Sequence, residues 1–350
     1  MRVLVVNAGS SSLKLRVLDG DDAVLATHDL GPEDPWPDLP AVDAVGHRVV
    51  HGGERFRDAV VLDDAVEAAL DALTVLAPLH QPGSLRGVRR ARDVLPDVPH
   101  VACFDTAFHA TLPAAATTYA VPREWRERFG VRRYGFHGLS HAHASRRAAE
   151  LTGASRIVTC HLGAGASLAA VRDGRCVDTT MGFTPLEGLV MATRSGSVDP
   201  GMLLWVQDAA GLSAAEVAEA LTHRSGLAGL AGTGDLRAVL LAADGGDSDA
   251  ALAVEVYVRS LRAHAAAMVA ALGGLEALVL TGGVGEHAPR IRATLADGLR
   301  HLGVAVDLDR NAVTAGEADI TGAAGTARVL VLRAREDLEI ARQTRALLAG

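Results

Sequence analysis

The sequence predicts an α/β fold made of two related halves. Short apolar runs with the composition of β-strands recur along the chain, and longer segments with helical periodicity lie between many of them. A stretch near the start, residues 3–20, and a second one, residues 157–174, share one order: strand, turn of small residues, strand, Asp-Gly. The length of 350 residues also suits about two domains, at roughly 150 residues each.

The strand-like runs are rich in Val, Leu, Ile and Ala, and the helical segments repeat their apolar residues every three or four positions. We expect strands at Arg2–Val6, Lys14–Leu18, Ala44–Val50, His100–Phe104, Ile157–His161, Leu168–Val171, Ala277–Thr281 and Arg328–Leu332. We expect helices at Asp64–Leu76, Gly83–Val94, Ser140–Leu151, Ala214–Thr222, Asp249–Leu272, Arg290–His301 and Glu336–Leu348. Ser213, followed three residues later by Glu216, predicts a capping box. The segment Pro32–Pro40, PEDPWPDLP, predicts an extended surface connection.

Both repeated stretches predict β-hairpins. In each of them an alternating segment ends at an Asp-Gly pair, Asp19-Gly20 or Asp173-Gly174, which is the usual signal of a tight hairpin turn. The turns inside the stretches, GSSSL and GAGASL, consist mainly of Gly, Ser and Ala. The similarity is too short to demonstrate a duplication, but two halves that each present one loop to a shared cleft would explain it.

The net charge and the cysteines limit the class of protein. A formal net charge of −8 and a pI near 5.9 argue against nucleic acid or an anionic membrane as the main partner. The cysteines have no CxxC spacing and lie in or beside apolar runs, which predicts buried, reduced thiols at Cys103, Cys160 and Cys176. The start of the chain is too short in apolar residues for a signal peptide, and no apolar run approaches the roughly 20 residues of a membrane helix. We therefore expect a cytoplasmic protein.

The first small turn carries two residue types that the chain otherwise avoids. Lys14 is the only lysine among 34 Lys and Arg residues, and Asn7 is one of two asparagines. A turn of Gly and Ser brings backbone N–H groups close to a ligand, while Asn7 offers an amide and Lys14 a point charge, which together suit a phosphate. A tight turn without any ligand remains the alternative. The turn lacks the Walker A pattern GxxxxGK[ST] and leads into a strand. The glycines of TGGVGE, Thr281–Glu286, follow an apolar strand and are likewise placed to admit a nucleotide.

Five further motifs place His, Arg or Asp among Gly, Pro and aromatic residues at the edges of apolar runs: GHRVVHGGE, APLHQP, FDTAFH, YGFHGLSH and MATRSGSVDP. Loop residues at such edges often carry function. A zinc site is one explanation for the histidines, but none of them has a ligand spacing such as HExxH, which argues against it. The spread of Arg48, Arg194, His80 and His137 instead indicates a positive pocket for anions.

These motifs, together with NAGSSSLK, MGFTPLEGL and TRSGxxDP, resemble those of the acetate kinase family, within the superfamily of acetate and sugar kinases, heat-shock chaperones and actin. The resemblance runs from residue 1 to beyond residue 340. It implies two ribonuclease-H-like (actin-like ATPase) domains with ATP in the cleft between them. The first domain would comprise residues 1–107 and the C-terminal helix 337–350, and the second, nucleotide-binding domain residues 108–336. Family members are usually homodimers, and we expect the same here.

By this resemblance, the chain would transfer the γ-phosphoryl group of ATP to acetate, reversibly and in line, giving acetyl phosphate and ADP. A carboxylate is already anionic, so the reaction needs no general base, and the enzyme must instead bring two anions together. Arg48 and Arg194 match active-site arginines of the family, and their planar forks suit a carboxylate and a phosphoryl group. His137 resembles the histidine that stabilises the transition state, and Asp105 the essential aspartate that positions metal and phosphate. Surface ion pairing for the arginines and a structural role for His137 remain the alternatives.

The resemblance also assigns binding residues. Asn7 and Glu336 match the groups that organise Mg²⁺ through water, although a surface-helix role for Glu336 remains open. Acetate would bind at Arg48 and His80, with its methyl group among Val50, Leu79, Phe136 and Pro185. The residues that match the ATP site are Lys14, Ser10, Ser12, His161, Gly163, Ala164, Gly165, Asp235, Leu236, Arg237, Gly282, Gly283, Gly285 and Glu286.

The sequence departs from the family at four positions near these motifs. Ala164 stands where the family usually has Asn in the HLGAGAS motif, which removes one polar contact to the nucleotide phosphates. His287 replaces the Asn of the family's GEN motif, Ala192 replaces a glycine, and Arg335 replaces an Asn before Glu336. Turnover or the preferred phosphoryl donor could differ as a result.

The chain also lacks a strand-and-helix section that relatives carry between Leu18 and Gly46, which we interpret as peripheral trimming. Two other functions remain open. A small apolar pocket discriminates each added methylene by only about 1–3 kcal/mol, so a propionate or butyrate kinase is one alternative, and turnover across chain lengths distinguishes it. The departures at Ala164 and His287 also permit a degenerate nucleotide-binding sensor or scaffold, which would bind nucleotide and form no acyl phosphate.

Overall fold

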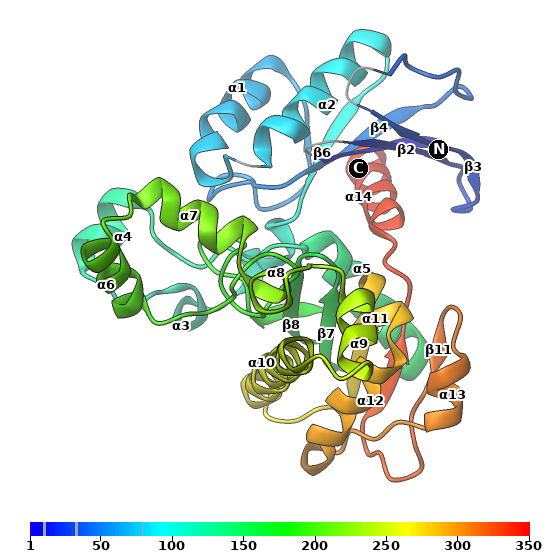
Figure 1. Ribbon diagram of the computed structural model, residues 1–350. Coiled ribbons are helices and arrows are strands. Elements are labelled where there is room, and N and C mark those ends of the chain that lie inside the picture. The colour runs from blue at the N-terminus through cyan, green and yellow to red at the C-terminus, as the bar shows by residue number, and fades with distance from the viewer. Residues whose placement is uncertain (10–11, 32–33, 79) are drawn as a thin grey trace. The chain divides into compact units, whose positions relative to one another are not determined.

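A computed structural model describes the chain in four ranges, residues 1–9, 12–31, 34–78 and 80–350 (Figure 1). The chain divides into two compact units, which are described one at a time. The first unit comprises Met1–Ala110, Phe136–His143 and Arg335–Gly350. The second unit comprises Thr111–Gly135 and Ala144–Ala334.

The first unit is built on one mixed sheet. Three parallel strands, β1, β4 and β6, form its centre, and an antiparallel meander continues from β1 through β2 to β3. The short strand β5 pairs antiparallel with β6 at the other edge. In the described residues the order across the sheet is β3 (Val24–Leu30), β2 (Leu13–Leu18), β1 (Val3–Ala8), β4 (Ala44–Val49), β6 (His100–Phe104) and β5 (Val60–Val61).

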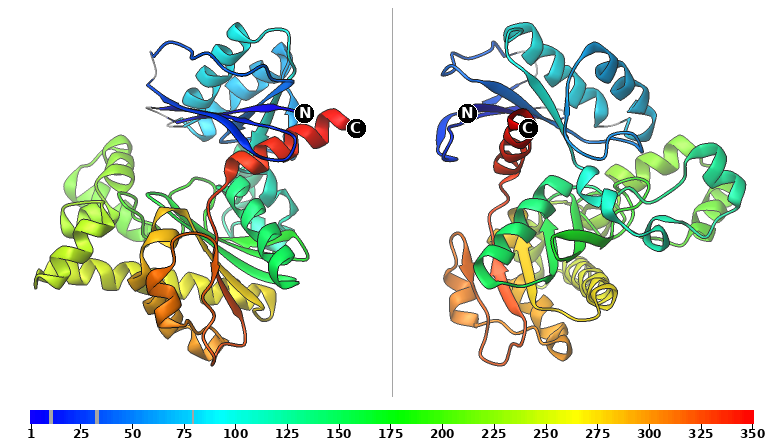
Figure 2. Two further views of the ribbon diagram at one scale, coloured as in Figure 1. Left: turned by 90° about the vertical axis from the view of Figure 1, so that its right-hand side faces the viewer. Right: turned by 180° about the vertical axis from the view of Figure 1, so that it is seen from behind.

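Helices cover both faces of this sheet, and the alternation of β1 decides which helix each of its side chains contacts. Leu4 and Val6 pack in the cluster of α2 (Gln81–Val94), whereas Val3 and Val5 pack in the cluster of α14 (Glu336–Ala349). Each fully buried side chain of this kind contributes about 1.5–3 kcal/mol. Figure 2 shows α14 alongside the sheet, with both chain termini at one end of this unit, where Arg345 Nε donates to Met1 O at 3.2 Å.

The close approach of α14 to the sheet depends on Gly46 in β4. A Cβ atom at this position would lie 2.6 Å from Ile340 Cγ2 and 2.5 Å from Thr344 Oγ1, both on α14. A residue with a side chain would therefore push the helix away. The remaining helices of the first unit are short: α1 (Asp64–Ala72), η1 (Leu73–Leu76) and η2 (Ala107–Thr111), whose last residue enters the second unit.

The segment around Trp36 is more buried than the sequence predicts. Trp36, Leu39 and Val42 pack against the apolar cluster of β1, β2 and α2, and the Arg90 guanidinium lies 5.6 Å from the Trp36 ring centroid. The segment contains no helix or strand from residue 34 to residue 43, which agrees with the predicted extended connection, but it also covers part of the core. Pro32 and Glu33 lie outside the described residues.

The second unit is built on a sheet of the same design. The parallel strands are β7, β10 and β12, the meander runs from β7 through β8 to β9, and the short strand β11 pairs antiparallel with β12. In the described residues the order is β11 (Ala318–Asp319), β12 (Arg328–Val331), β10 (Ala277–Thr281), β7 (Arg156–Leu162), β8 (Ala166–Arg172) and β9 (Arg175–Thr179).

The long helix α10 (Ser248–Leu272) packs against β7, β8 and β9 (Figure 1). It begins where the Asp247 side chain accepts from Ala250 N at 2.9 Å, and it ends at Gly273, whose φ of 68° favours glycine. Helix α5 (Gly138–Thr152) begins in the first unit and ends in the second. The other helices are α3 (Ala114–Thr117), α4 (Arg123–Phe129), α6 (Pro200–Ala210), α7 (Ala214–His223), α8 (Gly226–Ala231), α9 (Leu236–Asp244), α11 (Gly282–His287), α12 (Pro289–Gly298), η3 (Arg300–Leu302) and α13 (Leu308–Val313).

Of the two hairpin turns predicted at Asp-Gly pairs, the structure confirms one and contradicts the other. Asp173 and Gly174 form the predicted two-residue turn, with φ of 50° and 75°. The Asp19-Gly20 prediction is wrong, because β2 ends at Leu18 and β3 begins only at Val24. The Asp19 carboxylate accepts from the backbone N–H groups of residues 21 and 23, which stabilises a longer turn.

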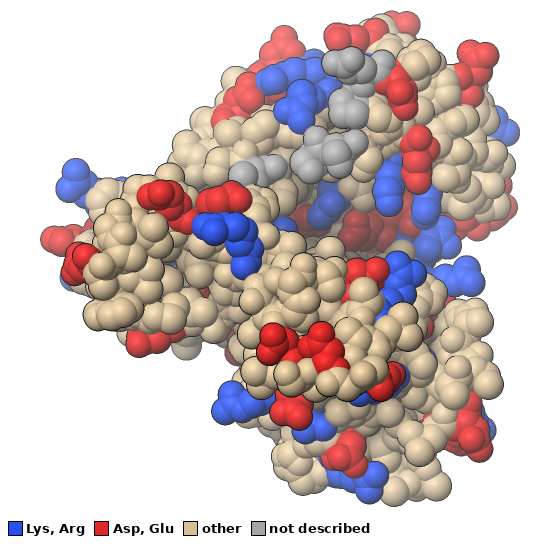
Figure 3. Space-filling view, viewed as in Figure 1, with Lys and Arg blue, Asp and Glu red and all other residues tan. Residues whose placement is uncertain are grey.

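The capping box of α7 is confirmed, since Ser213 Oγ accepts from Glu216 N while the Glu216 carboxylate accepts from Ser213 N. The three cysteines are free and buried, as predicted. The sequence reading missed the strands β3, β5, β9 and β11, which are short or exposed. One stretch, Gly226–Asp244, is long and apolar enough to cross a membrane by length and composition alone, but the structure divides it between α8 and α9. Figure 3 shows acidic and basic side chains interspersed over one face.

Candidate active site

The first unit gathers four predicted site residues at the carboxyl ends of its parallel strands. Arg48 lies near the end of β4, Asn7 lies near the end of β1, and Asp105 comes directly after β6. Glu336 begins α14. The Arg48 guanidinium donates to Asp105 Oδ2 from Nε at 3.0 Å and from Nη2 at 2.7 Å. Its Nη1 donates to Asn7 Oδ1 at 3.3 Å, and Asn7 Nδ2 donates to Glu336 Oε2 at 3.2 Å. We call Asn7, Arg48, Asp105 and Glu336 the charged cluster.

In the charged cluster, one carboxylate oxygen of Asp105 has no hydrogen-bond partner among the described residues. The Asp105 side chain is 1% exposed, and its Oδ1 atom is buried without a hydrogen-bond partner in the described part of the chain. Burial raises the pKa of Asp105 to about 6, although the Arg48 charge opposes this shift. Burial alone would lower the pKa of Arg48, but Asp105 and Glu336 outweigh it and raise the pKa, so the guanidinium stays charged. Glu336 Oε2 lies 3.8 Å from Arg48 Nε.

His137 occupies a strained backbone position beside this cluster. Its φ of 56° lies in the left-handed region, which costs a residue other than glycine about 1–3 kcal/mol. The next residue, Gly138, donates from its N–H to Asp105 O at 2.9 Å, and a Cβ atom there would lie only 2.1 Å from that oxygen. The YGFHGLSH motif therefore approaches Asp105 through a glycine, and the backbone strain falls on the predicted catalytic histidine.

The predicted acetate-side residues are placed less completely. His80 precedes α2 and is partly buried. Val50 and Phe136 are buried, and the Phe136 ring meets His51 edge-on at 5.6 Å between centroids. Leu79 lies outside the described residues. The acetate pocket therefore stays a prediction.

The predicted phosphate turn of the first unit is partly described. Gly9 N donates to Ser12 O at 2.8 Å, and Asn7 and Lys14 are register partners in β1 and β2. Lys14 is exposed and Ser12 is partly buried. Ser10 lies outside the described residues.

In the second unit, a tight turn presents Arg194. Met191 N donates to Arg194 O at 3.1 Å, and Ser225 N donates to Thr193 O at 3.0 Å, which fixes the turn against the start of α8. Arg194 Nη1 donates to the carbonyl of Pro185, a residue predicted to line the acetate pocket, at 3.2 Å. No carboxylate in the described ranges forms an ion pair with Arg194, and burial lowers the pKa of its guanidinium. An anionic ligand would supply the missing counter-charge.

The second unit also contains a cavity of about 420 Å³, which we call the nucleotide cavity. Six predicted ATP-binding residues line it: Gly163, Ala164, Asp235, Leu236, Arg237 and Gly283. Gly163 and Ala164 belong to the turn after β7, and Gly283 belongs to α11 after β10. The other predicted ATP-binding residues of this unit, which do not line the cavity, are His161, Gly165, Gly282, Gly285 and Glu286.

The apolar walls of the nucleotide cavity were not predicted. Leu227 of α8, Leu240 of α9, Tyr257 of α10 and Val284 of α11 line it together with Ala192, Gly234, His287 and Ala288. Helical periodicity places Leu240 and Tyr257 on apolar faces, but the same pattern marks ordinary core residues. Asp235 accepts from Arg237 N at 3.0 Å and so begins α9 at the edge of the cavity.

The charged cluster fits a magnesium ion carried by a nucleotide. No group of three or more His, Cys, Asp or Glu side chains that could hold a metal by itself occurs in the described ranges. Mg²⁺ usually keeps several waters and binds through one or two carboxylates and the substrate phosphates. The unpartnered Asp105 Oδ1 and the Glu336 carboxylate are hard oxygen donors of this kind.

Comparisons with known proteins agree in sequence and structure. The sequence profile of the Acetokinase family matches residues 25–342. Acetate kinase of Clavibacter michiganensis subsp. michiganensis is 44% identical over 393 aligned positions, which cover 99% of each chain. The aligned length exceeds the 350 residues of this chain, so the relative carries residues that this chain lacks.

Two solved structures extend the similarity to the whole fold. The acetate kinase of Porphyromonas gingivalis superimposes with a TM-score of 0.90 at 35% identity, covering 99% of each chain. A propionate kinase from Francisella tularensis subsp. tularensis superimposes with a TM-score of 0.91 at 34% identity, also covering 99% of each chain. The predicted α/β fold with two actin-like ATPase domains is thereby confirmed.

Proposed function

The chain belongs to the acetokinase family, and we propose that it is an acetate kinase, which transfers the γ-phosphoryl group of ATP to acetate. The observation that carries this proposal is the charged cluster, in which the buried Asp105 Oδ1 has no hydrogen-bond partner among the described residues. A buried polar atom in this condition costs about 1–3 kcal/mol until a ligand pairs with it. A scaffold that only bound nucleotide would have no use for this cost, so the cluster disfavours the degenerate alternative.

We assign the roles in the reaction as follows. An acetate oxygen attacks the γ-phosphorus, the bond to the bridging oxygen of the β-phosphate breaks, and ADP leaves with that electron pair. No proton moves, because acetate is ionised at neutral pH. Arg48 and Arg194 offset the repulsion between the two anions, and His137 donates a hydrogen bond to the phosphoryl oxygens. Asp105 orients Arg48 through the two hydrogen bonds to its Oδ2 atom.

The nucleotide cavity is the proposed adenosine site. Its walls of Leu227, Leu240 and Val284 suit a flat purine, and its glycines allow the backbone to come close to the ligand. We propose phosphate-side contacts from the other predicted residues except Glu286, whose carboxylate holds two backbone amides. Lys14 would act as a point charge, and the others as backbone or hydroxyl donors: Ser10, Ser12, His161, Gly163, Ala164, Gly165, Gly282, Gly283 and Gly285. Asp235, Leu236 and Arg237 are proposed to border the adenosine.

We propose Mg²⁺ as the cofactor, held near Asn7, Asp105 and Glu336 with the ATP phosphates. When bound, the ion would neutralise charge on the phosphate oxygens. The chain's own residues supply the rest: Asn7 Nδ2 orients the Glu336 carboxylate at 3.2 Å, and Arg48 screens the two carboxylates from each other.

The proposed acyl acceptor is acetate, bound by Arg48 and His80 with its methyl group toward Val50, Leu79, Phe136 and Pro185. A propionate kinase is the second candidate, because a solved propionate kinase is 34% identical over 99% of this chain. An apolar pocket distinguishes the two acids by only about 1–3 kcal/mol.

Trapping the product with hydroxylamine tests the reaction. Purified protein receives MgATP with acetate, propionate, butyrate or no acid, and the acyl hydroxamate is measured over time. We expect hydroxamate with acetate, a lower rate with propionate, a still lower rate with butyrate, and none without acid. A higher kcat/KM for propionate would change the substrate. ADP or ATP binding without hydroxamate from any acid would favour the sensor or scaffold instead.

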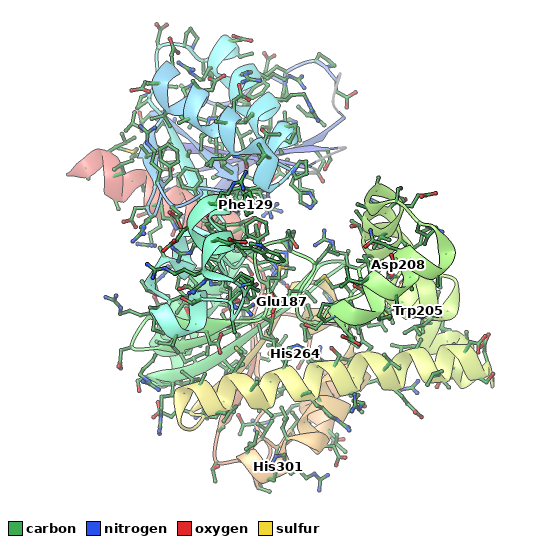
Figure 4. The ribbon with its side chains drawn as sticks, turned by 90° about the vertical axis from the view of Figure 1, so that its left-hand side faces the viewer. Phe129, Glu187, Trp205, Asp208, His264 and His301 are labelled. Carbon is green, nitrogen blue, oxygen red and sulfur yellow. The ribbon has the colours of Figure 1, made fainter. Side chains whose placement is uncertain are left out.

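We also propose a homodimer in the cytoplasm, with neither nucleic acid nor a membrane as partner. Helix α6 exposes Leu204 at 65% and Trp205 at 69%, and large apolar side chains at a surface are typical of protein interfaces. Figure 4 labels Trp205 and Asp208 on this helix. Light scattering should give twice the chain mass of 36.2 kDa, and Trp205→Glu should lower it. A wild-type monomer would contradict the proposal.

The proposed domain limits are residues 1–107 with 337–350, and residues 108–336. The compact units support this division, although they assign Phe136–His143 to the first unit and place the last crossing between Ala334 and Arg335.

A further inference from the structure

Glu286, in the short helix α11, uses one carboxylate oxygen to hold two backbone amides. Its Oε1 atom accepts from Gly282 N at 3.0 Å and from Ala334 N at 2.9 Å. Gly282 begins α11, and its neighbour Gly283 lines the nucleotide cavity. Ala334 lies in the peptide that leads from β12 to α14, two residues ahead of Glu336.

The helix that carries Glu286 is itself held from its other end by Arg292, which is 1% exposed. Arg292 Nη1 donates to the carbonyl oxygens of Gly285 at 3.1 Å and of Glu286 at 2.8 Å. Its Nε and Nη2 atoms donate to Asn311 Oδ1 and Asn311 O, both at 2.7 Å. A six-residue helix has few internal hydrogen bonds, so these contacts fix its last turn.

The peptide around Ala334 is tied on both sides. Before it, Leu332 N donates to Leu280 O at 3.0 Å and continues the ladder between β12 and β10. After it, the Arg335 guanidinium donates to the Asp337 carboxylate, with Nε 2.9 Å from Oδ1 and Nη2 2.9 Å from Oδ2. Between these ties, the hydrogen bond from Ala334 N to Glu286 sets the path by which the chain reaches Glu336.

We propose that Glu286 is a positioning residue that links the nucleotide cavity to Glu336. The inference rests on the proposed function, in which Glu336 helps to organise Mg²⁺. A nucleotide that orders α11 at Gly283 also fixes the Glu286 carboxylate. That carboxylate holds Ala334 and thereby the start of α14. Glu286 acts through these two amides, because a carboxylate that contacted the phosphates directly would repel them.

The test compares two variants with a matched control. Glu286→Ala removes the acceptor of both amides, whereas Glu286→Gln keeps an oxygen that accepts them. Glu276→Ala is the control, because the Glu276 carboxylate likewise accepts from two backbone amides, Ser155 N at 2.7 Å and Arg156 N at 3.1 Å, at the other end of β10. For each protein the dissociation constant of ADP is measured by calorimetry in EDTA and in Mg²⁺. KM values for ATP and acetate are measured alongside.

We expect Glu286→Ala to raise the KM for ATP by about 5- to 25-fold, since each of the two lost hydrogen bonds is worth about fivefold. It should also abolish most of the gain in ADP affinity that Mg²⁺ gives the wild type, while the KM for acetate stays within about twofold. Glu286→Gln should stay within about threefold of the wild type, and Glu276→Ala should change only the melting temperature. In a Glu336→Gln background, Glu286→Ala should no longer alter the effect of Mg²⁺.

Three results would overturn the link. The first is an unchanged effect of Mg²⁺ on ADP affinity in Glu286→Ala. The second is a Glu286→Gln variant as impaired as Glu286→Ala, which would make the charge itself a ligand. The third is an equal loss in Glu276→Ala. Because ADP binding needs no turnover, a wild type that bound MgADP without forming acyl phosphate would refute the proposed function and leave the link testable.

Discussion

The two units share one strand order and differ in what lies at the carboxyl ends of their parallel strands. Read from the meander edge, the described sheets run β3-β2-β1-β4-β6-β5 and β9-β8-β7-β10-β12-β11. The first hairpins close with Ala8 opposite Leu13 and with Leu162 opposite Ala166. Asn7 of the first unit therefore corresponds to His161 of the second.

The pairing registers of the parallel strands extend this correspondence to other residues of the two sheets. Arg48, level with Asn7, corresponds to Thr281, which is opposite His161. On the third parallel strand, Cys103 lies opposite Arg48, and Leu332 follows Val331, the partner of Leu280, as Thr281 follows Leu280. Two residues after Cys103 and after Leu332, Asp105 therefore corresponds to Ala334. The first unit thus places buried charge where the second places small residues and a backbone amide. In the function proposed above, one backbone design serves electrostatic recognition of the reacting groups in one unit and recognition of nucleotide shape in the other.

Asp105→Asn is the change that should affect this comparison most. The side chain keeps its shape but loses the charge that holds Arg48, so kcat should fall by about 10³-fold or more. The hydroxamate assay under saturating MgATP measures this effect. Asp178→Asn, at a partly buried aspartate of the second unit, is the control and should leave kcat within about twofold. A kcat for Asp105→Asn within tenfold of the wild type would show that the charged cluster is structural.

Arg194→Lys tests the catalytic role proposed for Arg194 in the second unit. Lys keeps the charge but not the fork, so kcat should fall by about 10²-fold while the KM for ATP changes little, because Arg194 does not line the nucleotide cavity. Steady-state kinetics with each substrate varied gives both constants. A large rise in the KM for ATP with an unchanged kcat would instead place Arg194 among the nucleotide-binding residues.

The sequence predicted those parts of the molecule that have a local pattern. The strands Ala277–Thr281 and His100–Phe104 are continuous apolar runs, and the structure places them as predicted. The bond between Arg48 and Asp105 joins residues 57 positions apart, so only family resemblance brought them together. The walls of the nucleotide cavity were missed because Leu240 and Tyr257 follow the same helical period as core residues.

The segment around Trp36 shows a different limit of prediction from the sequence. Trp36 and its neighbours cover part of the sheet, yet their stretch of Pro and Asp has no strand or helix period. Composition predicted an extended path correctly and could not predict the burial, which depends on apolar residues far along the chain.

The first unit should also unfold in acid at a higher pH than the second unit. Burial lowers the pKa of His51 and of His109 to about 4, and it lowers the pKa values of His47 and His100 as well. His100 Nε2 donates to the carbonyl of Leu95 at 2.9 Å, so its Nδ1 accepts from His47 Nε2 at 2.8 Å and both rings are neutral. The unfolded chain takes up these protons near pH 6.5. The contribution of these neutral histidines to the free energy of unfolding is therefore fully present above that pH. For His51 and for His109, up to about 3 kcal/mol of this contribution is lost as the pH falls to about 4.

Tryptophan fluorescence can follow this acid transition separately in each unit. Trp36 lies in the first unit, whereas Trp125 and Trp205 lie in the second. In a protein with Trp125→Phe and Trp205→Phe, the emission of Trp36 should shift between about pH 6.5 and 4. In Trp36→Phe, the emission of the other two should shift at lower pH. A common transition below pH 4 would mean that the buried histidines do not control acid stability.

The smallest expected effect concerns the turn after β7. Ala164 lines the nucleotide cavity, and its carbonyl accepts from Ala192 N at 3.1 Å. Ala164→Asn adds a polar side chain there without breaking this bond, so the KM for ATP should fall about two- to fivefold. A matched change at Ala166, buried in β8, should impair folding instead. A tenfold gain in kcat would indicate that Ala164 limits the chemistry and not only binding.

In the proposed function, the charged cluster of the first unit serves the reaction and the nucleotide cavity of the second unit serves binding. Paired measurements on Asp105→Asn and Gly283→Phe test this division most directly. Gly283 is exposed, lines the nucleotide cavity and has no heavy atom within 4 Å of an added Cβ, so Phe fills the cavity without disturbing the fold. The dissociation constant of ADP in EDTA and the rate of acyl phosphate formation are measured for each variant. Asp105→Asn should bind ADP within about threefold of the wild type and lose about 10³-fold in turnover, whereas Gly283→Phe should bind ADP at least about tenfold more weakly. Equal loss of metal-free ADP binding in both variants, or unchanged binding in Gly283→Phe, would contradict the account.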